Sequence, residues 1–232
     1  MSNTKYLIII LIISLSASNK ISAQFQDTNS RTINSNLDVA QFAIKSDSNN
    51  SFYAVGSPFI NEKFEIARFN NINKTYSARY NAHLGEMQIQ RKNDTIALYN
   101  TENFEITFPS SSKTYKTYDY TNKENELKRG FLVVLKETDS LALLKEELVK
   151  FYPAKESTNG YDKAKPAEYR RTKDVYYYRQ GEHVSVLPQK RKDFIKLFPE
   201  HSKDLEVFIK KNKINFKQED DLITLFQYLE TL

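Results

Sequence analysis

The stretch TYSARYNAHLGEMQIQRKNDTIALYNTENFEITF, residues 75–108, decides the fold. Met87 and Ile89 alternate with polar residues, and Ile96 and Leu98 repeat this spacing a few residues later. Strict alternation over about four to eight residues is typical of a strand with one buried face. The stretch therefore predicts neighbouring strands whose apolar side chains share one face of a sheet.

The dipeptide Asn93-Asp94 lies between these strands and is typical of a two-residue turn. Both residue types tolerate the positive φ that the central positions of a type I′ turn require. With residues 93–94 at those positions, Ile89 pairs with Leu98 and Arg91 pairs with Ile96. Turn chemistry and apolar pattern then agree, so we expect this register.

Similar apolar patterns occur on both sides of this stretch, from residue 64 to residue 188. Phe64 and Ile66 predict one face of a strand, and the unbroken apolar run 131–135 predicts a strand covered on both faces. Gly181 suits the first central position of a type II′ turn between two strands. Strands are expected at 64–68, 104–108, 113–120, 131–135, and at 174–179 and 183–187. Residues 141–151 also fit helical spacing, but Pro153 after them and the turn before them favour strands there as well.

From Gln189 onward the apolar spacing becomes helical. The clearest helix starts at residues 219–221, whose carboxylates favour the free N–H groups of a helix start. A metal-binding cluster is the alternative interpretation of these three residues. Ser202 is a candidate N-cap for the preceding helix. The last helix is expected to bury Leu222, Leu225, Phe226 and Leu229, which lie at i, i+3, i+4 and i+7.

Together these patterns predict an α+β fold. A mainly antiparallel β meander or curved sheet is followed by a C-terminal cluster of short α-helices. The expected segments are an antiparallel β domain at 52–188 and a helical segment at 189–232. Because helices this short are marginal alone, we expect them to pack on the sheet.

Residues 1–23 have the layout of a secretory signal peptide. Lys5 precedes the apolar run 6–15, and Ala23 stands before the expected cleavage site. The run is shorter than the ~20 residues that a permanent transmembrane helix needs. The mature chain is therefore expected to begin at Gln24, with no transmembrane helix, and to reside in the periplasm or outer envelope. Residues 24–51 are polar and predict a linker with a candidate first strand.

The charge balance bears on the partner class. Removing residues 1–23 takes away two lysines and no acid, which leaves 32 basic and 29 acidic residues and a net charge of +3. This excess is too small to favour nucleic acid, which an exported chain rarely meets.

A series of short motifs follows in order along residues 52–232. They are Arg79-Tyr80-Asn81, Glu86-Met87, Gly130-Phe131, Tyr152-Pro153-Ala154-Lys155, Gly160-Tyr161, Lys165-Pro166-Ala167, Tyr176-Tyr177, Lys210-Lys211-Asn212-Lys213, Asp220-Asp221-Leu222 and Tyr228. In these motifs the chain resembles a family of uncharacterised exported proteins of Bacteroidota. The resemblance implies periplasmic or envelope residence and brings no activity or site residue. The helical C-terminus departs from the β-sandwich sorting domain that ends cargo of the secretion system typical of that phylum.

Residue types that form common catalytic and metal sites are sparse. The chain has no Cys, and its five glycines are too dispersed for a phosphate loop or a dinucleotide fingerprint. His83, His183 and His201 lack partners at metal-ligand spacing. Glu86 and Glu105 are a candidate acid pair for sugar hydrolysis, but alternation places them on the solvated side of their strands. The sequence therefore predicts no enzyme, no cofactor and no metal site.

Residues 150–192 are the most uneven part of the chain in charge. They hold eleven basic and five acidic residues, a net charge of +6, with tyrosines between them. Aromatic and cationic side chains together bind sugars, lipid headgroups or acidic proteins. Alternatively, long Lys and Arg side chains protect sheet edges from pairing with other chains. The candidate binding residues are Tyr161, Lys165, Arg170, Arg171 and Tyr177.

The sequence thus predicts an exported, non-catalytic cell-envelope protein that binds an envelope protein, an anionic glycan or an anionic lipid. Two alternatives stay open. One is an envelope-acting hydrolase whose site is assembled from dispersed carboxylate and His residues, which a cleft with a carboxylate pair or a His–Asp contact would favour. The other is a purely structural envelope component.

Overall fold

In the computed structural model, the described residues are 44–46, 54–92, 94–98, 100, 102–157 and 163–232. They all lie in one compact unit, Ser35–Leu232. The expected signal peptide and most of the expected linker lie outside the described residues. Within that linker, strand β1 (Ile44–Ser46) is described. No helix in the described part of the chain is long and apolar enough to cross a membrane.

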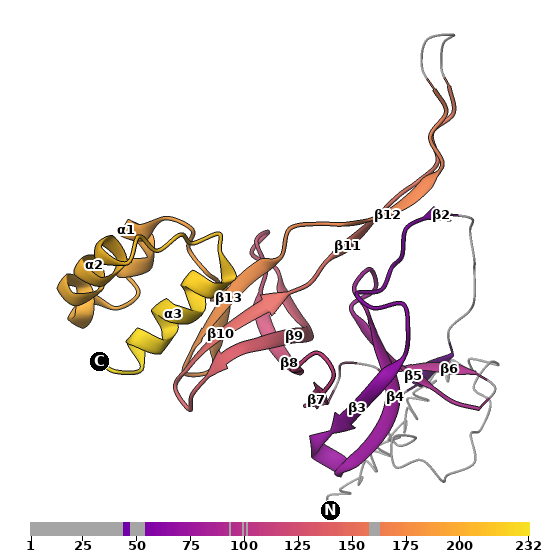
Figure 1. Ribbon diagram of the computed structural model, residues 1–232, viewed down its shortest axis with the longest axis horizontal. Coiled ribbons are helices and arrows are strands. Elements are labelled where there is room, and N and C mark those ends of the chain that lie inside the picture. The colour runs from indigo at the N-terminus through magenta and orange to yellow at the C-terminus, as the bar shows by residue number, and fades with distance from the viewer. Residues whose placement is uncertain (1–43, 47–53, 93, 99, 101, 158–162) are drawn as a thin grey trace, which may run out of the picture. The chain divides into compact units, whose positions relative to one another are not determined.

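Strands make up most of the described chain as far as residue 186, and helices follow (Figure 1). After β1 the strands are β2 (Ala54–Val55), β3 (Glu65–Phe69), β4 (Lys74–Asn81), β5 (Glu86–Gln90), β6 (Thr95–Leu98), β7 (Glu105–Phe108), β8 (Lys113–Thr121), β9 (Leu127–Glu137), β10 (Leu141–Glu146), β11 (Val149–Tyr152), β12 (Ala167–Arg171), β13 (Val175–Gln180) and β14 (His183–Val186). The α-helices are α1 (Arg191–Ile195), α2 (Ser202–Lys211) and α3 (Glu219–Leu229).

Eleven strands form one sheet in the order β1-β6-β5-β4-β3-β7-β8-β14-β13-β10-β9. Because β9 also pairs with β8, the strands β8, β9, β10, β13 and β14 form a closed five-strand ring. The parallel pair Ser185–Thr121 closes it. A second sheet has the order β11-β12-β2, in which β12 and β2 are parallel. A mainly antiparallel, curved sheet followed by short helices confirms the predicted α+β class.

The register predicted for β5 and β6 is wrong by two residues. Ile89 lies opposite Ile96 and not opposite Leu98. The Arg91 N–H donates to the Asp94 carbonyl oxygen at 2.8 Å, so these residues flank the turn. Their side chains also form an ion pair at 3.6 Å. A shift of two residues leaves every side chain on its original face, so the apolar pattern fits both registers equally well.

The turn between β13 and β14 follows the prediction made from Gly181. Gln180 lies opposite His183, which leaves two residues in the loop. Gly181 has a φ of 60°, which the first central position of a type II′ turn requires.

The core consists of three apolar clusters. Phe131 and Val133 of β9 belong to the cluster formed with β3 to β7, whereas Leu132 belongs to the cluster inside the ring. This strand is therefore covered on both faces, as its unbroken apolar run predicted. In β10, Leu144 points into the ring and Leu143 joins the third cluster, with the helices.

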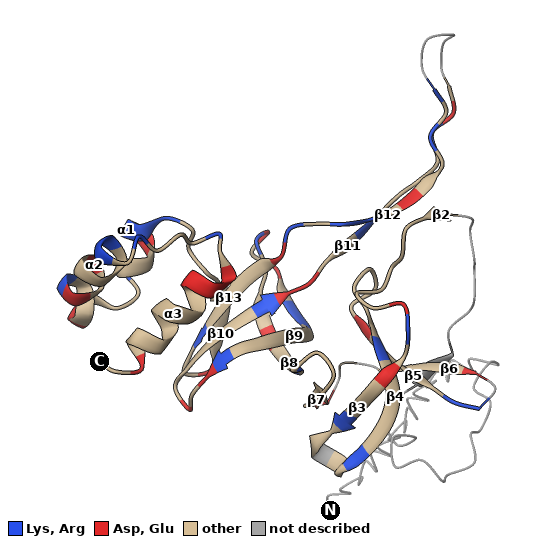
Figure 2. Ribbon diagram, viewed as in Figure 1, with Lys and Arg blue, Asp and Glu red and all other residues tan. Residues whose placement is uncertain are grey.

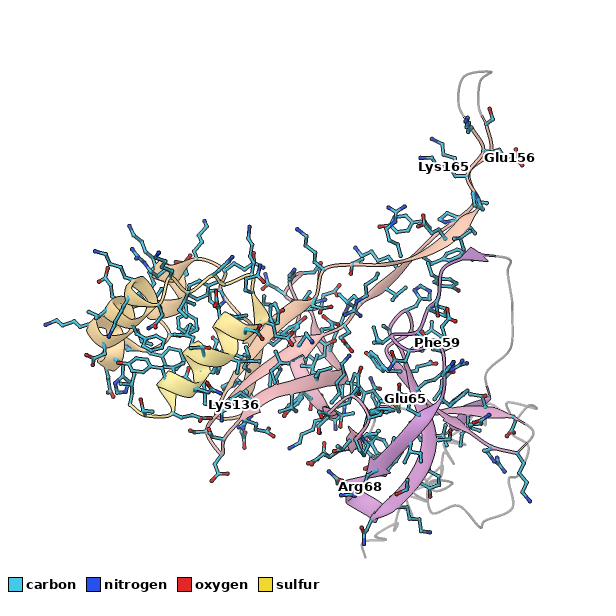
Figure 3. The ribbon with its side chains drawn as sticks, in the orientation of Figure 1. Phe59, Glu65, Arg68, Lys136, Glu156 and Lys165 are labelled. Carbon is cyan, nitrogen blue, oxygen red and sulfur yellow. The ribbon has the colours of Figure 1, made fainter. Side chains whose placement is uncertain are left out.

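Of the C-terminal helices, α3 packs on β9 and β10. The four predicted residues of α3, Leu222, Leu225, Phe226 and Leu229, are buried in one cluster with Leu143. Lys136 of β9 forms an ion pair with Glu230, which follows α3, at 3.1 Å (Figure 3). The helical spacing therefore identified the buried face of α3 correctly.

The predicted N-cap at Ser202 is wrong. A 3-10 turn at Pro199–His201 leads directly into α2, and Ser202 is the first residue of that helix. Its φ of −58° and ψ of −40° are helical, whereas an N-cap residue has an extended backbone.

The predicted buried face of β3 is also wrong. Ala67 and Phe69 are buried, whereas Ile66 is 67% exposed. Phe69, one residue beyond the expected strand, lies on the buried side with Ala67 and packs in the cluster that also contains residues of β4 to β7.

Candidate functional site

Strands β11 and β12 form a two-stranded antiparallel ribbon, and the two chain segments remain paired beyond the ends of these strands. Tyr152 lies opposite Glu168, and further out Lys155 and Lys165 form an antiparallel bridge (Figure 1). We call residues 149–157 and 163–171 the basic ribbon. Strand β2 adds a third strand, and Gly56 follows it with a φ of 80°. A Cβ at Gly56 would lie 2.3 Å from the Tyr169 carbonyl oxygen, so the close approach of these strands requires glycine.

The two faces of the ribbon differ in character. Phe151 and Tyr169 lie opposite each other with ring centroids 5.0 Å apart, and the ring of His83 lies 5.3 Å from Tyr169. Along β11 and β12, the alternate positions carry Tyr152 and Arg170, whose guanidinium lies 4.9 Å from the Tyr152 ring centre. The first face packs against the protein, and the second is exposed.

Basic side chains face each other across the ribbon. Lys150 lies opposite Arg170, and Lys155 lies opposite Lys165 with reciprocal backbone hydrogen bonds of 2.9 and 2.8 Å. Like charges directly opposite destabilise a strand pair. Their exposed positions limit this cost, because water and salt screen the repulsion.

Few carboxylates compensate these charges within the ribbon. Glu168 forms an ion pair with Arg170 at 2.6 Å, and the hydrogen bond from Arg170 holds the pKa of Glu168 below its ordinary value. Figure 2 shows the basic and acidic residues of the ribbon, and Figure 3 shows Lys165 and Glu156 on its outer part. No ion pair with another described residue is formed by Lys150, Lys155, Lys163 or Lys165.

The structure separates the five predicted binding residues. Lys165 and Arg170 are exposed on the ribbon, as predicted. Arg171 instead reaches the carboxylates of Glu147 and Asp174. Tyr161 lies outside the described residues.

Tyr177 cannot belong to a binding surface. It is 1% exposed and donates its hydroxyl to Glu146 inside the ring at 2.8 Å. The prediction failed because three successive tyrosines, 176–178, give no alternation that shows which side chain points inward.

Sequence reasoning missed a set of tyrosine–carboxylate hydrogen bonds around the ring. Glu137 accepts from Tyr118 at 2.7 Å, Glu146 accepts from Tyr120 at 2.9 Å, and Glu147 accepts from Tyr115. Burial raises the pKa of each of these tyrosines, and the neighbouring carboxylate raises it further. The hydroxyls therefore stay protonated and donate. The only sequence signal was the tyrosine-rich β8, whose partners lie on distant strands.

Glu147 is the most buried of these carboxylates, at 3% exposure. Lys113 donates to it at 2.8 Å and Arg171 at 3.3 Å, in addition to Tyr115. Burial acts to raise the pKa of Glu147, but the hydrogen bonds from Lys113 and Tyr115 and the charges of Lys113 and Arg171 outweigh it and lower the pKa. Glu147 is thus a charged anchor between β8, β10 and the ribbon.

The other candidate groups are dispersed. Glu86 and Glu105 lie on β5 and β7, which β4 and β3 separate in the sheet. His83 and His183 are exposed, and His201 is partly buried. Among the described residues, no group of three His, Asp or Glu side chains is placed to hold a metal ion.

In the predicted acidic cluster at the start of α3, two carboxylates form an ion pair or a hydrogen bond with other residues of the chain. Glu219 forms an ion pair with Lys145 at 2.7 Å, and Asp221 accepts from the Asn215 N–H at 2.9 Å. These contacts, together with the helix start, account for the cluster.

No protein-family model matches the chain, and no curated protein or solved structure matches it either. The resemblance to exported proteins of Bacteroidota therefore stays a prediction, and the functional argument depends on the described residues.

Proposed function

We propose that the protein is an exported, non-catalytic cell-envelope protein whose basic ribbon binds an anionic partner. The observation that supports this best is that basic residues occupy directly opposite positions of the ribbon, Lys150 with Arg170 and Lys155 with Lys165. A protein without an anionic partner gains nothing from opposing these charges, because opposite charges at one position would keep the edges equally soluble and stabilise the ribbon.

The ribbon also offers an aromatic surface between its charges. Tyr152 is 41% exposed and lies beneath Arg170. A flat ring beside cations suits a sugar ring or a lipid headgroup that carries an acidic group. The shared chemistry is therefore an anionic group next to an apolar or sugar surface, and the source is a glycan, a lipid or an acidic envelope protein.

The test is a charge-removal variant, Lys155→Gln with Lys165→Gln. Both side chains are exposed and outside every ion pair among the described residues, so the fold should be unaffected. Near an anionic surface each basic residue contributes about 1 kcal/mol, so losing two should weaken binding roughly thirtyfold at low salt. Binding would be measured to phosphatidylglycerol vesicles, to heparin and to detergent-extracted envelope proteins. Phosphatidylcholine vesicles are the neutral comparison.

A matched control removes the same charge elsewhere. Lys203→Gln with Lys210→Gln changes two exposed lysines of α2 that form no ion pair with a described residue. Equal losses in both double variants would show that net charge, and not the ribbon, causes binding. Unchanged binding by the ribbon variant, together with a fall in stability, would favour the edge-protecting role.

A further inference from the structure

One end of the five-strand ring carries a cavity of about 260 Å³. Its lining includes Tyr80, Tyr120 and Glu146, with Lys128 and Arg129 of β9 and His83 from the β4–β5 loop. Glu146 is the last residue of β10, and its carboxylate accepts hydrogen bonds from Tyr120 and Tyr177. Mouths of rings of strands are frequent ligand sites because side chains from several strands converge there.

The two cations that line the cavity are neutralised by other residues. Arg129 forms an ion pair with Asp119 at 2.6 Å and also donates to the Asn100 carbonyl oxygen at 2.7 Å. The Lys128 ammonium lies 3.5 Å from the Glu126 carboxylate, and the Lys128 side chain is half exposed. Glu146 is the one charged group of the lining without an ionic partner among the described residues.

Comparable carboxylates of this protein do have such partners. Glu137 contacts Lys116 and Arg179, Glu147 contacts Lys113 and Arg171, and Glu219 contacts Lys145. A larger hollow of about 450 Å³ contains Glu137 together with both of its cations, so that carboxylate already has its counter-charges. Partly buried carboxylates are normally paired with a cation, and Glu146 departs from this rule inside a cavity.

A second polar group of the cavity has no hydrogen-bond partner among the described residues. Tyr80 is 5% exposed, and its hydroxyl forms no hydrogen bond with a described residue. Every fully enclosed polar side-chain atom among the described residues does have a partner, so the Tyr80 hydroxyl is open to a hollow. After burial, the charge of Glu146 contributes most to raising the pKa of Tyr80, which places this hydroxyl near Glu146.

We propose that this cavity binds a small ligand through a primary ammonium group, with Glu146 as counter-charge and the Tyr80 hydroxyl as second acceptor. An ammonium has three donors and no acceptor, so it can donate to the Tyr80 hydroxyl and to the Glu146 carboxylate, whose oxygens can each accept a second hydrogen bond, and it supplies the missing positive charge. The rings of Tyr80 and Tyr120 border the same space and suit a cation. At roughly 30 Å³ per water molecule, the cavity equals about nine waters, which suits an amino sugar or a short alkylamine.

The test uses two matched probe pairs in NMR titrations of the full chain at pH 6.5. Glucosamine is compared with glucose, and butylammonium with butanol. We expect saturable shifts with at least one ammonium probe and binding at least tenfold weaker for its neutral partner. Glu146→Gln keeps the shape of the side chain and should weaken ammonium binding tenfold or more.

Two further variants separate binding from folding. Glu137→Gln removes another tyrosine-bound carboxylate outside the cavity lining and should leave ammonium binding unchanged. If Glu146→Gln does not fold, Tyr80→Phe replaces it, with an expected loss of at least threefold. Equal binding of glucose and glucosamine would overturn the ammonium assignment. Failure of both ammonium probes to bind at tens of millimolar would show a cavity that water alone fills.

Discussion

Replacing Glu147 by Gln tests whether the missed tyrosine–carboxylate contacts stabilise the fold. Glu147 is buried and accepts from Lys113, Tyr115 and Arg171. A hydrogen bond to a charged acceptor contributes about 1.5–3 kcal/mol, and Gln keeps a neutral acceptor, so the Tyr115 contact should lose about 1 kcal/mol. Lys113 and Arg171 are 28% and 40% exposed, so water replaces part of their interaction and each loses about 0.5–1 kcal/mol.

We therefore expect Glu147→Gln to lower the free energy of unfolding by about 2–3 kcal/mol at pH 7. Urea unfolding followed by circular dichroism measures this as a shift in the transition midpoint with an unchanged slope. Glu126→Gln is the matched control, because Glu126 and its partner Lys128 are both largely exposed and Gln can still accept from the Asn122 amide, so the transition midpoint should barely move. If Glu147→Gln has an effect as small as the control, the three donors are equally well satisfied without the charge.

The same variant has a predicted pH dependence. The pKa of Glu147 in the folded protein lies below its ordinary value of 4.5. Its stabilisation is therefore fully present above that ordinary value and is lost as the pH falls through the folded pKa. The difference in stability between the natural protein and Glu147→Gln should shrink below about pH 4.5. A difference that grows on acidification would mean that the folded pKa is raised, which would refute this account of the site.

Three further predictions follow from burial, backbone conformation and the N-terminus. Leu225→Ala should destabilise by about 2–5 kcal/mol, because Leu225 is fully buried between α3 and the sheet; a change within ~0.5 kcal/mol in urea unfolding would mean that α3 is detached. Gly56→Ala should cost more than Gly85→Ala, since both have positive φ but only at Gly56 would the new Cβ collide with backbone; equal thermal midpoints would contradict this. The mature protein should begin at Gln24 in the envelope or periplasmic fraction, and N-terminal sequencing that finds Met1 on cytoplasmic material would exclude export.

The spacing of apolar residues was sufficient to predict most strands and helices and, for some of them, which face is buried. The four leucine and phenylalanine positions of α3 were identified because helical spacing leaves one apolar stripe. In β9, an unbroken apolar run correctly indicated cover on both faces, since neither side carries polar residues. In β3 the same reasoning chose the wrong face, because Ile66 and Phe69 lie on opposite sides and local pattern does not reveal which neighbour each side meets.

Contacts between strands that are far apart in the sequence could not be predicted from the sequence alone. The bond from Tyr115 to Glu147 joins residues 32 positions apart. Its existence depends on the registers of β8, β9 and β10, and the pairing of β9 with β10 contains an irregularity between Leu143 and Leu144. A shift of one residue in any of these strands would turn the carboxylate to the other face. The five-strand ring, and the cavity at its end, are consequences of such registers and not of any motif.

The contact between the ring and the ribbon also decides which variants can test binding. Arg171 ends β12 and is held by Glu147, while the Thr172 N–H donates to the Leu148 carbonyl oxygen at 3.0 Å. Reversing the charge of Arg170 and Arg171 together would place a carboxylate against buried Glu147 and destabilise this junction whether or not an anion binds. Lys155 and Lys165 lie beyond the junction on exposed chain, so their removal changes only the charge of the ribbon. A loss of binding in that double variant, with an unchanged unfolding midpoint, therefore indicates contact with the partner, and the same loss in an Arg171 variant would not.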